Sequence, residues 1–140
     1  MESIDLRGQR PRRARAELDG IVFLPRSIDK IRATLPGGDI HDYTIEGFTA
    51  MMLEHFGIAL EDFTEAVRSA KSDGDVAAYV RKHAKNGGAQ SWNDFVKNRE
   101  IYKGDRAAAI ADYPWLSEHP ELKYSIDFLD YREEHNIDDD

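Results

Sequence analysis

Proline and glycine interrupt this chain so often that no helix in it can be long. Of the 140 residues, 10 are glycine and 5 are proline, and several stand directly after a segment with helical periodicity. Proline cannot continue a helix, and glycine commonly ends one in a left-handed conformation. The breaks are Pro36-Gly37-Gly38, Gly57, Asn86-Gly87-Gly88, Pro114 and Pro120. They exclude a bundle of long antiparallel helices.

Between the breaks, apolar residues recur three or four positions apart, as they do on one face of a helix. The clearest stripe consists of Phe48, Met51, Met52, His55 and Phe56. Short helices with frequent breaks favour an array whose members cross at steep angles. The sequence therefore predicts an all-α fold, a compact orthogonal array of six or seven short helices.

One short extended segment is expected near residues 20–24, where Gly-Ile-Val-Phe-Leu forms an apolar run closed by Pro25. Ser27 is then a good N-cap for a helix over about residues 28–35. Asp29 would lie in the positive first turn of that helix, where a carboxylate is favourable.

Charge is unevenly distributed, and the net value is −8. Residues 1–16 hold five arginines and two acids, whereas residues 117–140 hold nine acids and two bases. Charge-rich termini without apolar periodicity seldom fold. We expect a flexible basic arm over residues 1–16, a single helical domain over residues 17–137 and an acidic tail over residues 138–140.

Composition argues against several classes of function. An acidic chain is poorly suited to nucleic acids, because contacts to phosphate supply most of that affinity. No apolar run approaches the roughly 18 residues of a membrane span. The absence of cysteine removes thiolate metal sites and suits a cytoplasmic protein. No residue spacing typical of a metal or cofactor site occurs, so we expect neither a metal nor a cofactor. On the grounds of charge and hydropathy we also expect no binding to nucleic acid or to a membrane.

The most unusual local chemistry lies in the segment from Arg26 to Arg32, at the predicted helix start. Arg26 and Lys30 are four positions apart, and Asp29 and Arg32 are three apart, so each pair can share a helix face. Free backbone N–H groups at a helix start, beside cationic side chains, suit a carboxylate or phosphate ligand. The alternative is a solvated helix face with one ion pair worth roughly 0.3–0.5 kcal/mol.

The loop after this segment adds two further candidates. His41 could act as a general acid or base, because the reference pKa of a histidine lies near neutrality. Tyr43 adds a phenol two residues later. The candidate binding residues are Arg26, Asp29, Lys30, Arg32, His41 and Tyr43.

Several short strings match the pattern of a known family. They are Leu24-Pro25-Arg26, Asp29-Lys30, Arg32-Ala33, Leu35-Pro36-Gly37, Gly57-Ile58, Ser72-Asp73 and Val76-Ala77. The chain resembles a bacterial domain of unknown function, number 5069, over residues 14–84 and more loosely around Pro114-Trp115. The family has no established activity, so the resemblance implies no catalytic role. It implies that the charges of the Arg26–Arg32 segment are a recurrent motif, either a site or an ion-pair network.

Three functions remain open at this stage. The first is a non-catalytic binding module for a small anion or an acidic partner. The second is a small enzyme acting on an anionic metabolite, in which Arg26 and Arg32 would hold the substrate. There Lys30 or His41 would move the proton and Asp29 would orient that group. The third is a structural or adaptor domain. The absence of any catalytic spacing favours the binding module, and the sequence leaves the oligomeric state open.

Overall fold

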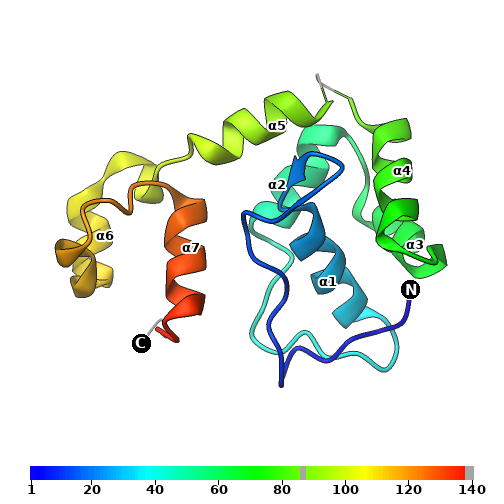
Figure 1. Cartoon of the computed structure of the whole chain (residues 1–140), viewed down its shortest axis with the longest axis horizontal. Helices are drawn as coiled ribbons and strands as arrows, with labels where there is room; N and C mark the ends of the chain where they lie inside the picture. The colour runs from blue at the N-terminus through cyan, green and yellow to red at the C-terminus, as the bar shows by residue number, and fades with distance from the viewer. Residues whose placement is uncertain (86–87, 138–140) are drawn as a thin grey trace. The chain divides into compact units, whose positions relative to one another are not determined.

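The computed structural model describes residues 1–85 and 88–137 and is mostly helical (Figure 1). Within those residues it contains seven α-helices, two short 3-10 helices and one two-stranded hairpin. The predicted all-α class, with six or seven short helices, is confirmed. The predicted acidic tail at residues 138–140 lies outside the described residues, as does most of the helix stop predicted at residues 86–88.

The chain divides into two compact units, an N-terminal unit over Met1–Trp92 and a C-terminal unit from Asn93 onward. The first contains β1 (Glu17–Leu18), β2 (Ile21–Val22), α1 (Leu24–Thr34), α2 (Phe48–Phe56), α3 (Leu60–Ser69), α4 (Asp73–His83) and the start of α5 (Gly88–Lys97). The second contains the end of α5, η1 (Ile101–Gly104), α6 (Arg106–Asp112), η2 (Pro114–Glu118) and α7 (Ser125–Glu134). That one domain spans residues 17–137 stays a prediction.

The extended segment predicted near residues 20–24 is one strand of a hairpin. β1 and β2 are antiparallel, and the register pairs Leu18 with Ile21. Asp19 and Gly20 make the turn with φ values of 54° and 74°. An Asp-Gly pair with two positive φ values is favoured in tight hairpins, because its twist matches that of the strands.

α1 begins at Leu24, so the predicted cap at Ser27 is wrong. Phe23 precedes the helix in the left-handed region with φ 75°, and Pro25 lies in the first turn, where no N–H is needed. The Ser27 N–H already donates to the Phe23 carbonyl at 2.9 Å. Its hydroxyl is buried and lies 2.8 Å from Thr49 Oγ1. The backbone of the charged segment therefore offers no free N–H groups from Ser27 onward.

The core of the N-terminal unit is apolar and joins every helix of that unit. α1 contacts α3 and α4, and α2 contacts α3. The Trp92 indole N–H donates to the Val22 carbonyl at 2.8 Å, which connects α5 to the hairpin. Fully buried side chains include Ile28, Met52, Phe56, Phe63, Val67, Val76, Val80 and Trp92.

Residues 1–16, expected to form a flexible arm, instead pack against the rest of the N-terminal unit (Figure 1). Leu6 and Ala14 are 2% and 0% exposed. The Leu6 N–H donates to the Asp39 carbonyl at 2.8 Å, and the Asp39 N–H donates to the Ile4 carbonyl at 3.2 Å. These apolar and backbone contacts hold a segment whose arginine content alone suggested disorder.

The C-terminal unit has its own small core of Ile101, Ala109, Leu116, Leu122 and Phe128. The Trp115 ring stacks on Phe128 at 5.6 Å between centroids and on Tyr131 at 5.4 Å. Aromatic stacking thus ties η2 to α7. Across residues 1–85 and 88–137, no helix combines the length and apolar character that crossing a membrane requires.

We predict that Phe56→Ala destabilises the chain by about 3–5 kcal/mol, because it opens a cavity beside Trp92. Leu60→Ala is the matched control, since Leu60 is 44% exposed whereas Phe56 is 0% exposed. Urea unfolding followed by tryptophan fluorescence measures both. Equal losses in the two variants would contradict the assigned core.

Candidate functional site

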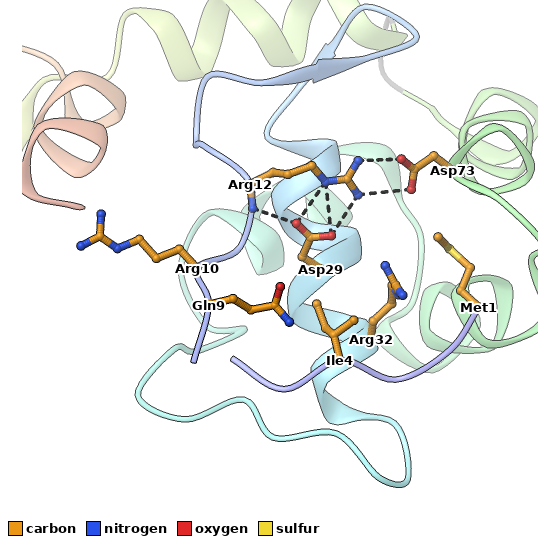
Figure 2. A pocket seen from close by; sticks show the side chains of 8 residues that line it. All are labelled: Met1, Ile4, Gln9, Arg10, Arg12, Asp29, Arg32 and Asp73. Atoms are coloured by element: carbon orange, nitrogen blue, oxygen red, sulfur yellow. Dashed lines mark hydrogen bonds and ion pairs between the residues drawn. The ribbon is translucent and has the colours of Figure 1, made fainter. Parts of the chain in front are cut away.

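A guanidinium from the N-terminal segment lies between carboxylates of two helices (Figure 2). Arg12 Nη2 lies 2.9 Å from Asp29 Oδ1 on α1, and Arg12 Nη1 lies 2.6 Å from Asp73 Oδ2 on α4. The Arg12 backbone N–H also donates to Asp29 Oδ2 at 2.8 Å. We call these three residues the Arg12 bridge. It joins the segment before the hairpin to α1 and α4.

Hydrogen bonds to the two carboxylates favour the charged form of the Arg12 guanidinium. Partial burial lowers the pKa of the Arg12 guanidinium, but hydrogen bonds to Asp73 and Asp29 outweigh it, so the pKa lies above the usual value. The Arg12 side chain is 39% exposed and that of Asp29 is 9% exposed. Water therefore screens the Arg12–Asp29 ion pair in part. We expect this pair to stabilise the fold more than a surface ion pair does and less than a fully buried one does.

The Arg12 bridge forms one wall of a pocket of about 370 Å³ (Figure 2). The lining residues are Met1, Ile4, Gln9, Arg10, Arg12, Asp29, Arg32 and Asp73. Arg32 Nε donates to the Glu2 carbonyl at 2.7 Å. Within residues 1–85 and 88–137, no carboxylate forms an ion pair with Arg32. Figure 2 shows the Arg10 side chain directed away from Asp29.

Two of the six predicted site residues, Asp29 and Arg32, therefore line one pocket. Two others, Arg26 and Lys30, lie over the Phe23 ring, and a third, Tyr43, lies beside Arg26. Arg26 Cζ lies 5.9 Å from the Phe23 centroid and 5.6 Å from that of Tyr43. Lys30 Nζ lies 5.5 Å from the Phe23 centroid. Such cation–π contacts stabilise a buried cation by about 0.5–2 kcal/mol.

Backbone carbonyls also hold the two buried cations. Arg26 is 1% exposed and Lys30 is 6% exposed. Arg26 Nη1 donates to the Arg12 carbonyl at 3.1 Å, and Lys30 Nζ donates to the Thr44 carbonyl at 3.0 Å. Through these bonds α1 fixes both the segment before the hairpin and the loop after α1.

His41 belongs to neither group. It is exposed, with φ 53°, and its backbone N–H donates to Asp39 Oδ1 at 2.8 Å. Its ring nitrogen Nε2 lies 3.4 Å from Asp42 Oδ2. In the described part of the chain, no hydrogen bond or ion pair connects His41 with Lys30 or Arg32.

Sequence reasoning missed Arg12, Gln9 and Asp73. The sequence places Arg12 and Gln9 in the predicted flexible arm, and Asp73 appears there only in a short string that matches the family pattern. The apolar residues Pro11 and Ala14 on either side of Arg12 could have indicated that this segment packs against the fold. Both are buried in the structure. Nothing in the sequence connects Arg12 with Asp73, which is 61 positions away.

A family model described as Domain of unknown function (DUF5069) matches residues 8–135. The chain belongs to this family. The DUF5069 match begins within the expected arm and includes Arg12, Asp29 and Asp73. It therefore covers the whole Arg12 bridge and parts of both compact units. None of the curated proteins matches the chain.

We predict that Asp29→Asn destabilises this DUF5069 chain by about 1–3 kcal/mol, because the Arg12 guanidinium and backbone N–H lose a charged acceptor. Asp75→Asn is the matched control, since Asp75 is an exposed α4 carboxylate that accepts one backbone bond from Lys71 at 2.9 Å. Urea denaturation midpoints compare the variants. Should Asp29→Asn unfold no earlier than Asp75→Asn, the Arg12 bridge would not stabilise the fold.

Proposed function

We propose that this chain is a non-catalytic binding module that takes a small anion in the pocket beside α1. The observation that carries the proposal is Arg32, a guanidinium that lines a pocket of about 370 Å³ and forms no ion pair with any carboxylate of the described residues. A guanidinium presents paired N–H donors that match a carboxylate or phosphate in two parallel hydrogen bonds. Arg32 would be the main contact for such a ligand.

The rest of the pocket narrows the class of anion. Two carboxylates, those of Asp29 and Asp73, line the pocket together with three guanidiniums, those of Arg10, Arg12 and Arg32. With one more guanidinium than carboxylate, the pocket suits an anion of one or two charges, and its two carboxylates disfavour polyanions such as nucleic acid. The Gln9 side-chain amide and the apolar side chain of Ile4 also line the pocket. The Gln9 nitrogen already donates one hydrogen bond, to the Asp5 carbonyl at 3.1 Å. A volume of this size suits a metabolite, since small-molecule pockets start at about 300 Å³.

The positions of the other candidate residues favour binding over acid/base catalysis. The Lys30 ammonium is buried against the Thr44 carbonyl and the Phe23 ring. The His41 ring lies beside Asp42 in an exposed loop. A proton-transfer group has to lie within hydrogen-bond reach of the ligand, and these two groups do not line the pocket. The absence of cysteine supports a cytoplasmic site of action.

A thermal-shift and calorimetric screen tests the proposal. The panel holds phosphate, succinate, citrate and an acidic peptide, each matched in ionic strength to a sodium chloride reference. We expect one anion to stabilise the wild type, by about 2.7 kcal/mol at one hundred times its dissociation constant. Arg32→Gln should lose that gain, because the guanidinium is the main contact.

Arg81→Gln is the matched control, since Arg81 is an exposed arginine of the same unit that pairs with Asp19. It should retain the full ligand-dependent shift. The unliganded melting temperature of each variant separates lost binding from lost stability. A shift that Arg32→Gln leaves intact, or no shift with any member of the panel, would overturn the proposal.

A further inference from the structure

Three polar side chains of the C-terminal unit form a hydrogen-bonded chain of carboxylate, imidazole and phenol. Glu121 Oε1 lies 2.9 Å from His119 Nδ1, and His119 Nε2 lies 3.1 Å from the Tyr131 hydroxyl oxygen. Glu121 and His119 come from the loop between η2 and α7, and Tyr131 comes from α7. None of them lines the pocket beside α1.

Donor and acceptor chemistry fixes the direction of this chain. An ionised carboxylate only accepts hydrogen bonds, so the proton of the neutral His119 ring resides on Nδ1 and points at Glu121. The Nε2 lone pair is then the acceptor, and the Tyr131 hydroxyl is the donor. A hydroxyl that donates to an imidazole, which a carboxylate orients in turn, is the arrangement of an activated nucleophile with its base.

Neighbouring groups hold the imidazole and the phenol in place. The Arg106 guanidinium donates to three backbone carbonyls of residues 116–122, including that of His119 at 2.7 Å. The Trp115 ring lies 5.9 Å from the His119 ring and 5.4 Å from the Tyr131 ring, measured between centroids. The pair is therefore positioned by the fold itself, without a ligand.

The Tyr131 phenol is half-buried, and two aromatic rings stack on it. Trp115 stacks on the Tyr131 ring at 5.4 Å and His135 stacks on it at 3.9 Å. The His119 side chain is 29% exposed and that of Glu121 is 60% exposed, so the hydrogen-bonded chain lies at the surface of its unit.

We propose that Tyr131 is a nucleophile that accepts an acyl group from a neutral activated ester or amide, with His119 as its base and Glu121 as the positioning residue. The Tyr131 oxygen bonds to the acyl carbon as its proton passes to His119 Nε2. The bond from that carbon to the leaving group then breaks, and the leaving group departs with the proton. The product is an O-acyl tyrosine. α7 carries four carboxylates and one guanidinium, which disfavours anionic substrates.

Tyr102 provides an internal comparison. It is 39% exposed, and its hydroxyl donates to the Asp112 carboxylate. That hydrogen bond raises the pKa of Tyr102 to about 12. Exposure alone would make Tyr102 the faster phenol, since Tyr131 is half-buried. We expect the opposite order of reaction rates, because His119 can take the proton of Tyr131 whereas the Asp112 carboxylate disfavours ionisation of Tyr102.

Acetylation by a limiting amount of N-acetylimidazole tests the proposal on the full chain. Peptide mass spectrometry gives the rate at each tyrosine, and release by hydroxylamine identifies the O-acetyl ester. We expect Tyr131 to react at least about tenfold faster than Tyr102. His119→Asn should remove that advantage, and Glu121→Gln should reduce it several-fold, while the Tyr102 rate stays unchanged in both.

The pH profile separates activation from simple accessibility. With His119 as the base, the Tyr131 rate should rise less steeply with pH than in His119→Asn, where only the ionised phenol reacts. If His119→Asn partly unfolds the C-terminal unit, the acetylation rates of Tyr113 and Tyr124 rise as well. The test then depends on the surface variant Glu121→Gln. A Tyr131 rate no higher than that of Tyr102, or one that Glu121→Gln leaves unchanged, overturns the proposal.

Discussion

The Arg12 bridge is the interaction on which the arrangement of the N-terminal unit depends. One guanidinium reaches the Asp29 carboxylate on α1 and the Asp73 carboxylate on α4, and its backbone N–H donates to Asp29 as well. An arginine is suited to this position because its planar group offers donors in two directions and stays charged. Without it, the carboxylates of Asp29 and Asp73 would remain close together, and the Asp29 side chain is only 9% exposed, which makes the loss of its cation unfavourable.

The pocket beside α1 follows from this bridge. Because Arg12 holds the first segment against α1 and α4, Ile4 and Gln9 of that segment line an open pocket of about 370 Å³ together with Arg32. The charges of the Arg26–Arg32 segment thus have different roles. Arg26 and Lys30 are buried and donate hydrogen bonds to the backbone of neighbouring segments. Asp29 belongs to the Arg12 bridge, and Arg32 lines the pocket.

Local features of the fold could be predicted from the sequence, and long-range ones could not. Helix breaks such as Gly57 are local, and Gly57 does end α2 in the left-handed conformation. The start of α1 was misplaced because Phe23 adopts a left-handed φ of 75°, which an apolar residue rarely does. The basic arm was misjudged because Arg12 meets its partners 17 and 61 positions away. Asp29 and Arg32 could be predicted as pocket residues because they belong to the charged Arg26–Arg32 segment. The sequence could not show that Arg26 and Lys30 of the same segment lie outside the pocket.

Hydrogen exchange at the Arg12 backbone amide tests the central claim most directly, since this N–H donates to the Asp29 carboxylate at 2.8 Å. If the first segment is held by the Arg12 bridge, its amide exchanges at least about a hundredfold more slowly than in an unstructured peptide, together with the amides of α1. An Arg12 amide that exchanges at the unstructured rate while α1 stays protected would contradict the account. It would make the first segment a mobile arm and remove one wall of the pocket.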